Sequence, residues 1–101
     1  MGHVVIATWK AKPGERNKVM RILEEVTPGN RSEAKMLHFQ AQVSTTDPDT
    51  IVLYEHYTDP SGYEDHRATE AFQTKVLGEA IPLLADRHVQ TFTTIEGHTA
   101  S

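Results

Sequence analysis

Residues 4–11 read VVIATWKA, and this stretch decides the fold because its apolar side chains occupy both even and odd positions. Successive side chains of a strand point to opposite faces of a sheet, so a strand of this composition needs cover on both faces. We therefore predict a buried strand in the centre of a sheet. Lys12-Pro13-Gly14 then breaks the pattern and ends the strand.

The rest of the chain divides into helices and strands by the period of its apolar residues. A spacing of three and four residues indicates a helix at 15–26, which we expect to stop at Thr27-Pro28-Gly29-Asn30. Alternation and turn residues indicate the other elements: strands at 37–43 and 51–57 around a turn at 45–49, a short helix at 60–66 with Asp59 as its N-cap, a helical stretch that begins at Thr69 and loosens from Gly78 to Leu84, and a last strand at 88–95. This order, β-α-β-β-α-β, predicts an α+β, ferredoxin-like fold.

The connections between these elements predict the arrangement of the sheet. Right-handed crossovers place the first and third strands side by side in the centre of a four-stranded antiparallel sheet, with the helices on one face. The other face of the first strand is apolar too, and a second copy of the sheet is the economical cover, so we expect a homodimer. A hairpin turn centred near Pro48 predicts the cross-strand pairs Gln40–Glu55 and His38–Tyr57.

The composition of the chain narrows its class. With 101 residues, 24% charged and 38% hydrophobic, it has the make-up of an ordinary globular protein, and we expect one domain over 1–101 with a loose tail at 96–101. The net charge of −4 argues against nucleic acid as a partner. Without cysteine the chain has no disulfide, thiolate nucleophile or Cys-based metal site, and it suits a reducing compartment. No signal peptide or membrane span is apparent, so we expect a cytoplasmic protein without a membrane partner.

Residues 51–84 read IVLYEHYTDPSGYEDHRATEAFQTKVLGEAIPLL and resemble the antibiotic-biosynthesis monooxygenase family of small dimeric α+β barrels. The shared features are the Val-Leu-Tyr-Glu end of a strand, an aromatic residue three positions before His66, and the Ala-Thr-x-x-Phe start of the next helix. Ala11-Lys12-Pro13-Gly14 and Arg31-Ser32-Glu33 extend the resemblance toward the N-terminus. The resemblance implies a dimeric barrel and one of the family's activities, which include cofactor-independent oxygenation of aromatics and quinols, isomerisation and haem degradation.

Several positions depart from the family's sharper catalytic patterns. Many members carry a second histidine just before the helix phenylalanine, where this chain has Ala71, so the resemblance does not imply a two-histidine mechanism. The haem-degrading branch uses Asn, Trp and His at positions that align with Ala7, His66 and Val76. None of these three matches, and the resemblance therefore disfavours haem degradation.

His66 and Glu55 are the candidate catalytic residues. The resemblance places a recurrent pocket residue at His66, and an imidazole can take a proton from a phenol or hydroquinone near neutral pH. The alternative is that His66 stabilises the end of a helix, where a cation is favoured. Glu55 interrupts an apolar strand and needs a partner or a raised pKa. It is therefore either a proton acceptor or substrate anchor, or a structural residue that forms a salt bridge or an inter-subunit hydrogen bond with an arginine such as Arg31, Arg67 or Arg87.

Aromatic and histidine side chains provide the candidate walls of a substrate pocket. A flat aromatic ligand needs apolar walls with a few polar groups to orient it. No histidine spacing typical of a metal site occurs, and no flavin or nucleotide motif, so we expect neither a metal nor a cofactor. The residues we expect to contact a small aromatic substrate are Trp9, His38, Phe39, Tyr54, His56, Tyr57 and Phe72.

Three functions fit these residues. The first is a monooxygenase that uses no cofactor and acts on a small aromatic, quinol or polyketide-like substrate, because a deprotonated, electron-rich substrate can itself reduce dioxygen in a dry pocket. The second is an isomerase on the same fold, which needs an acid/base pair and no dioxygen. The third is a non-catalytic small-ligand-binding or stress-associated protein, in which His66 and Glu55 are structural.

Overall fold

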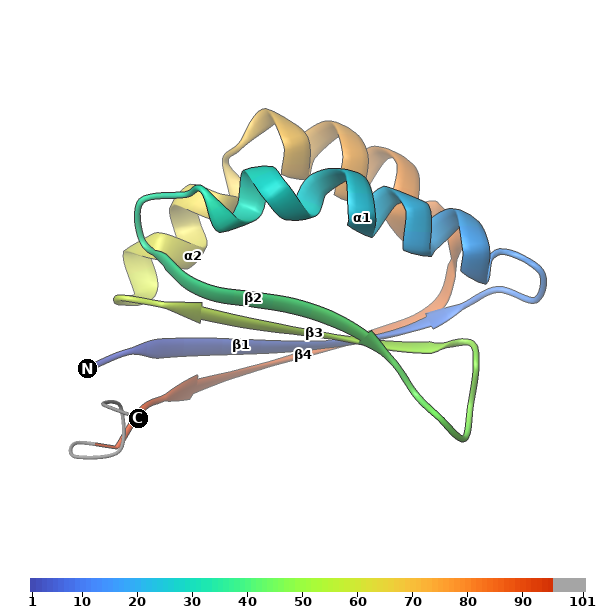
Figure 1. The fold of residues 1–101 in the computed structure, drawn as a ribbon, viewed down its shortest axis with the longest axis horizontal. Helices are drawn as coiled ribbons and strands as arrows, with labels where there is room; N and C mark the ends of the chain where they lie inside the picture. Colours follow the sequence, from blue (N-terminus) through green and yellow to red (C-terminus); the bar gives the residue numbers. More distant parts are fainter. Residues whose placement is uncertain (96–101) are drawn as a thin grey trace.

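A computed structural model describes residues 1–95, whose elements follow the predicted β-α-β-β-α-β order (Figure 1). The expected loose tail at 96–101 lies outside the described residues. The elements are β1 (His3–Ala11), α1 (Arg16–Arg31), β2 (Met36–Val43), β3 (Thr50–Tyr57), α2 (Pro60–Arg67), η1 (Phe72–Ala80), η2 (Ile81–Leu83) and β4 (Leu84–Thr93). Of these, η1 is a wide helix of the π type and η2 is a single 3₁₀ turn. Among the residues described, no helix has the length and apolar character needed to cross a membrane.

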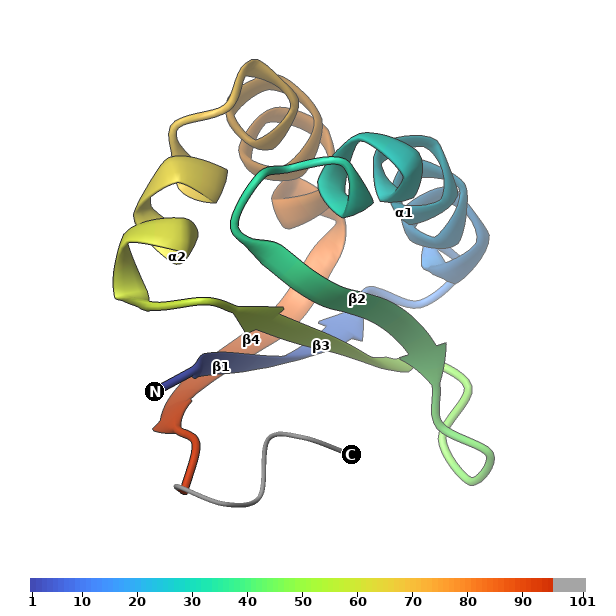
Figure 2. The ribbon, with the colours of Figure 1, turned by 60° about the vertical axis from the view of Figure 1, so that its left-hand side comes forward.

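The four strands form one antiparallel sheet in the order β2-β3-β1-β4. This order confirms that the first and third strands lie side by side in the centre. The helices lie together on one face of the sheet, and Figure 2 shows α1 and α2 above it, with the segment of η1 between them. The chain therefore has the α+β, ferredoxin-like fold that the order of elements predicts.

The central strand β1 divides its side chains between the two faces of the sheet. Val5, Ala7 and Trp9 point toward the helices and are buried, whereas Val4 and Ile6 point the other way. We call the side without helices the open face. By register it carries Val4, Ile6, Thr8 and Lys10 of β1, Thr50, Val52, Tyr54 and His56 of β3, and His38, Gln40 and Gln42 of β2. That a second copy of the chain covers this face stays a prediction.

Helix α1 runs further than the sequence predicts. It continues through Pro28 to Arg31, so the expectation that Thr27-Pro28-Gly29-Asn30 stops the helix is wrong. A proline inside a helix removes one backbone hydrogen bond. Two features offset this loss: the Thr27 hydroxyl donates to the Leu23 carbonyl at 2.6 Å, and Asn30 is buried on the same face as the apolar side chains of the helix. The last turn is thus held by tertiary burial, which local sequence does not report.

The hairpin of β2 and β3 has a register one residue away from the predicted one. Phe39 lies opposite Glu55, and Gln40 lies opposite Tyr54, so the predicted pairs Gln40–Glu55 and His38–Tyr57 are wrong. The connecting loop is centred on Asp47, whose carboxylate accepts from the Asp49 amide at 3.1 Å and from the Thr50 hydroxyl at 2.8 Å. A bulge between Met36 and His38 shifts the far end of β2 as well. The turn chemistry of Asp47, rather than Pro48, therefore sets the register.

The second helical stretch and the last strand also differ from expectation. The Thr69 hydroxyl accepts from the Phe72 amide at 3.1 Å, which confirms the predicted cap. Beyond Phe72 the chain forms η1, and Pro82 lies in η2. Strand β4 then begins at Leu84, four residues before the predicted start at 88, because pairing with Ala11 of β1 holds a segment that has no alternating apolar pattern.

Candidate active site

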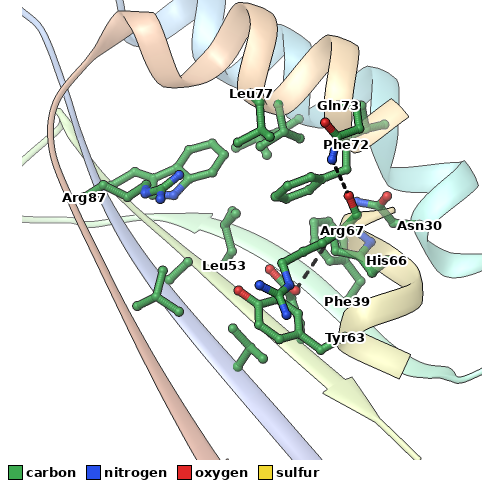
Figure 3. Close-up of a pocket in the computed structure, with 18 residues that line it drawn as sticks. Asn30, Phe39, Leu53, Tyr63, His66, Arg67, Phe72, Gln73, Leu77 and Arg87 are labelled. Carbon is green, nitrogen blue, oxygen red and sulfur yellow. Dashed lines mark hydrogen bonds and ion pairs between the residues drawn. The ribbon is translucent and has the colours of Figure 1, made fainter. Parts of the chain in front are cut away.

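A cavity of about 330 Å³ lies between the sheet and the helices, and Figure 3 shows the side chains that line it. Most of the wall is aliphatic or aromatic, with a few polar and charged side chains. The first group is Val5, Ala7, Trp9, Leu23, Val26, Phe39, Leu53, Tyr63, Phe72, Val76, Leu77 and Val89; the second is Asn30, Glu55, His66, Arg67, Gln73 and Arg87. A largely apolar hollow with a few polar groups is the usual form of a small-molecule site.

The structure brings together five of the nine residues that the sequence places in a site. Both candidate catalytic residues line the cavity, together with the aromatic residues Trp9, Phe39 and Phe72. Tyr57 is fully buried behind the wall, where its hydroxyl donates to Glu55. The role of each of these residues stays a prediction.

Three expected site residues lie away from the cavity. Tyr54 and His56 sit on the open face because they alternate along β3 with Leu53 and Glu55, which face the helices. His38 joins them, since the observed register pairs it with His56. These three residues therefore do not line this cavity, because neighbouring residues of one strand cannot face the same side.

Short helix α2 brings His66 to the cavity. Asp59 caps the helix by accepting from the Ser61 amide at 2.8 Å, and Pro60 occupies its first turn. His66 follows in the last turn with only 3% of its surface exposed. Its ring packs edge-on against Phe72, with 5.3 Å between ring centroids. The imidazole is thus fixed between the end of α2 and the start of η1.

Glu33 sets the orientation of the His66 ring. Its carboxylate oxygens lie 2.9 Å and 3.1 Å from Nδ1 of His66. A carboxylate at this distance accepts a hydrogen bond, so Nδ1 carries the hydrogen and Nε2 of the neutral ring is left as a proton acceptor. Nδ1 of the ring therefore bonds to Glu33. His66 also lies in the last turn of α2, so the alternative role of stabilising the helix end stays a prediction.

Glu55 is buried on the other side of the His66 ring. Its Oε1 accepts from the Tyr57 hydroxyl at 2.5 Å and lies 4.0 Å from Nε2 of His66. Burial raises the pKa of the Glu55 carboxyl, with the Tyr57 hydrogen bond and the His66 charge acting against the rise. The pKa of Tyr57 is raised as well, by burial and then by the Glu55 charge, so the phenol remains a donor. Within residues 1–95 of one chain no arginine forms an ion pair with Glu55. The predicted hydrogen bond to an arginine of a second subunit stays a prediction.

Glu33 is a residue that the sequence alone does not identify as part of the site. It lies in the turn between α1 and β2, its side chain is 19% exposed, and it precedes His66 by 33 positions in the sequence. It reaches the ring because α1 continues to Arg31 before the chain turns. The only available signal is its place in the Arg31-Ser32-Glu33 segment that resembles the family. Four further wall residues carry no sequence signal as site residues: Asn30, Arg67, Gln73 and Arg87.

Other parts of the described structure contain fewer candidate catalytic or metal-binding groups. A groove of about 420 Å³ runs between α1 and β2, and its wall includes Met20, Leu23 and Val43. Its charged members, Glu24 and Arg31, are exposed. Over residues 1–95, no three His, Asp or Glu side chains are placed to hold one metal ion. The four linked groups Glu33, His66, Glu55 and Tyr57 are therefore the chemical centre of the described structure.

Solved structures share this fold. One described as an antibiotic biosynthesis monooxygenase is 26% identical, with a TM-score of 0.84 over 92% of this chain and 98% of that one. PA3566 from Pseudomonas aeruginosa is 23% identical, with a TM-score of 0.86 over 93% and 94% of the two chains. A conserved protein from Bacteroides thetaiotaomicron, described as a possible oxidoreductase, is 16% identical, with a TM-score of 0.82 over 90% and 95%. No curated protein matches the chain.

The family comparison covers most of the chain. The model of the family described as antibiotic biosynthesis monooxygenase matches residues 2–76, which run from β1 into η1. This span contains Glu33, Glu55 and His66, so the linked groups at the cavity lie inside the matched region. The resemblance that the sequence carries is thereby confirmed: the chain belongs to the antibiotic biosynthesis monooxygenase family.

Proposed function

We propose that this protein is a monooxygenase that needs no cofactor and oxidises a small aromatic, quinol or polyketide-like substrate in the cavity. The observation that carries the proposal is the buried His66 ring, with Nδ1 bonded to Glu33 and Nε2 left as a base at the wall of an aromatic-lined cavity. An imidazole held by a carboxylate in this way is a common general base. Trp9, Phe39 and Phe72 supply faces for a flat ring.

The proposed reaction converts a ring CH₂ group flanked by phenolic or keto groups into a carbonyl. Nε2 of His66 takes one proton from the carbon, and the resulting carbanion transfers electrons to dioxygen and forms a C–O bond. The peroxide takes the proton back from the imidazolium to give a hydroperoxide. Loss of the second C–H proton together with hydroxide leaves the carbonyl and one water. The sum, CH₂ plus O₂ to C=O plus H₂O, balances in atoms and electrons.

The carboxylates on both sides of His66 have different tasks in this scheme. Glu33 holds the ring and stabilises the imidazolium once the proton has arrived. Glu55, with its raised pKa, is a second group able to accept a proton near the ring. Tyr57 bonds to Glu55 from behind the wall and keeps that carboxyl in place.

Oxygen consumption tests the proposal directly. We expect uptake with members of a panel of hydroquinones and anthrones, and His66→Ala should lower the rate by about 100-fold or more, the usual range for loss of a general base. His88→Ala, an exposed histidine on β4, is the matched control and should retain the wild-type rate. An absence of uptake by the wild type, or undiminished uptake by the His66 variant, would overturn the mechanism.

An isomerase is the second candidate, and a specific distance favours it. Nε2 of His66 and Oε1 of Glu55 are 4.0 Å apart, which is suitable for moving a proton between adjacent carbons of a small hydroxy-ketone. This chemistry needs no dioxygen, so turnover under strict anaerobiosis separates it from the first proposal. Ligands that raise the melting temperature without any product would favour the non-catalytic binding role instead.

We also propose that the protein is a homodimer that pairs through the open face. The support is the apolar character of Val4, Ile6 and Val52 on that face, together with the dimeric barrels of the family it resembles. Sedimentation at micromolar concentration should give the mass of two chains. A monomer under these conditions would contradict the proposal.

A further inference from the structure

The rim of the cavity carries two arginines that the proposed chemistry does not use. Arg67 comes from the last turn of α2 and Arg87 from β4, so they reach the cavity from different elements (Figure 3). Both residues are exposed. Throughout residues 1–95, no carboxylate lies within ion-pair distance of either guanidinium. Two positive charges therefore stand beside an apolar cavity without a partner in the described part of the chain.

The lysines of the chain behave differently. Each of four lysines has a carboxylate of the chain within ion-pair distance: Lys10, Lys18, Lys35 and Lys75. The net charge of the whole chain is −4, so carboxylates are not scarce. Lys12 and the other three arginines, Arg16, Arg21 and Arg31, also have no carboxylate within ion-pair distance in residues 1–95. What distinguishes Arg67 and Arg87 among these is their place in the wall of the cavity.

Arg67 is held in place without its charge being neutralised. Its guanidinium carbon lies 4.3 Å from the centroid of the Tyr63 ring, and its backbone carbonyl accepts from the Gln73 side chain at 2.7 Å. A guanidinium stacked on an aromatic face keeps the N–H groups of its edge free to donate. An anion at the rim therefore meets a donor whose position is already fixed.

Among the described residues, the single carboxylate in the cavity wall does not neutralise these charges. Glu55 is engaged with Tyr57 and His66, and burial raises the pKa of its carboxyl. Both guanidinium charges act on the Tyr63 phenol, where they oppose the rise that burial causes in the pKa of that group. Arg67 and Arg87 line the same cavity as Tyr63.

We propose that the ligand of this cavity is a flat aromatic molecule that carries a carboxylate, with the carboxylate bound by Arg67 and Arg87 and the aromatic body inside. Guanidinium groups bind carboxylates through paired N–H donors, which gives orientation as well as affinity. Trp9 and Phe72 then contact the ring system. The inference rests on the proposed function only in using the same cavity as the substrate site, and it makes no use of dioxygen.

A matched pair of probes tests the charge requirement. 2-Naphthoate and 2-naphthamide have nearly the same shape and differ by one negative charge. Calorimetric titration of the wild type should give a dissociation constant for the carboxylate about tenfold or more below that of the amide. Arg67→Gln and Arg87→Gln should each weaken 2-naphthoate by about fivefold to tenfold and leave 2-naphthamide unchanged. Raising the salt concentration should weaken only the carboxylate.

Two control variants locate the binding. Arg21→Gln removes an exposed arginine of α1 that lines none of the cavities and should change neither probe. Leu77→Trp enlarges a partly exposed residue at the cavity wall and should weaken both probes. Equal affinity for the two probes, or an equal loss with all three arginine variants, would overturn the inference.

Binding and turnover separate this inference from the proposed function. If the carboxylate preference depends on Arg67 and Arg87 but no quinol or anthrone supports oxygen uptake, the anion site stands and the monooxygenase proposal fails. If uptake occurs and depends on His66 but neutral and charged substrates react alike, the monooxygenase stands and the anion site fails.

Discussion

The two faces of the sheet carry similar types of residue, but the surroundings of these residues differ between the faces. On the helix side, Glu55 and Tyr57 are buried. Tyr57 bonds to Glu55, and Glu55 lies beside His66. On the open face, Nε2 of His56 is buried without a hydrogen-bond partner among residues 1–95. The His38 ring packs edge-on against the Tyr54 ring, with 5.6 Å between ring centroids. The buried polar groups are thus linked to one another on the helix side, whereas the buried Nε2 of His56 on the open face is not linked to another polar group in the described residues. A site is recognised by this linkage rather than by residue type.

The largest expected effect comes from truncating a side chain under the helices. Ile51 is 1% exposed, and Ile51→Ala should lower the free energy of unfolding by about 3 kcal/mol, because it leaves a cavity in the core. Its neighbour Val52 lies on the open face, and Val52→Ala should cost less than about 1 kcal/mol in the monomer.

Urea denaturation at two protein concentrations measures both variants. The loss for Ile51→Ala should not depend on concentration, whereas the loss for Val52→Ala should grow with concentration if the open face pairs with a second chain. Equal and concentration-independent losses would mean that the two faces do not differ in this way.

The next effect tests the link between Glu33 and His66. Glu33→Gln keeps the shape of the side chain but removes the charge that holds the imidazole, and kcat/KM should fall by about 10- to 100-fold. The acid limb of the pH–rate profile should also move, which a purely structural role would not cause. Glu64→Gln on the exposed side of α2 is the matched control and should leave both quantities unchanged.

A smaller effect follows from the raised pKa of Glu55. The folded state holds the proton of this carboxyl more tightly than the unfolded chain does, so its contribution to stability is full below the ordinary glutamate pKa and is lost as the pH rises through the folded value. Glu55→Gln keeps an acceptor for the Tyr57 hydroxyl and removes this loss. The variant should therefore gain melting temperature relative to the wild type over the pH range above the ordinary glutamate pKa. An unchanged difference across that range would show that Glu55 does not titrate abnormally.

The smallest effect belongs to the exposed pair of Lys10 and Asp47. The hydrogen bond from Lys10 lowers the pKa of Asp47 to about 2, so the stabilisation is present above the ordinary aspartate pKa and disappears as the pH falls through about 2. Lys10→Met should raise the pKa of Asp47, which an NMR titration of the carboxyl measures. Salt should weaken the pair in the wild type, as expected for an exposed ion pair. No comparable salt dependence is expected for the buried contact of His66 with Glu33.

The sequence predicts the arrangement of this fold because β1 is apolar on both parities, and that property depends only on local order. It does not predict the end of α1, because Pro28 is tolerated only where Asn30 is buried against other elements. It does not predict the register of the hairpin, because the adjacent residues Asp47 and Pro48 are both possible centres of the turn, and the two choices give registers that differ by one residue. Long-range contacts determine where α1 ends, and the hydrogen bonds of the loop determine the register of the hairpin.

The candidate site shows the same division. His66 and Glu55 could be identified from the sequence because the family resemblance places a pocket residue at His66 and because Glu55 interrupts an apolar strand. Tyr54 and His56 cannot face the same cavity as Glu55, because side chains alternate between the two faces along a strand. This conflict could be recognised from the sequence alone. The role of Glu33 could not be predicted from the sequence, since its contact with His66 joins a turn to a helix far along the chain. The sequence singled out Arg67 and Arg87 only as possible partners of Glu55, and it did not indicate that both line the cavity.

Trp9 gives the cavity a property of practical use. It is the only tryptophan of the chain, it is 3% exposed, and it forms part of the cavity wall. The intrinsic tryptophan emission of the whole protein therefore comes from one indole at one site. A molecule that enters the cavity changes the surroundings of that indole, whereas a molecule on the open face meets the other side of the strand. Unlabelled protein thus reports optically on the occupancy of its own cavity.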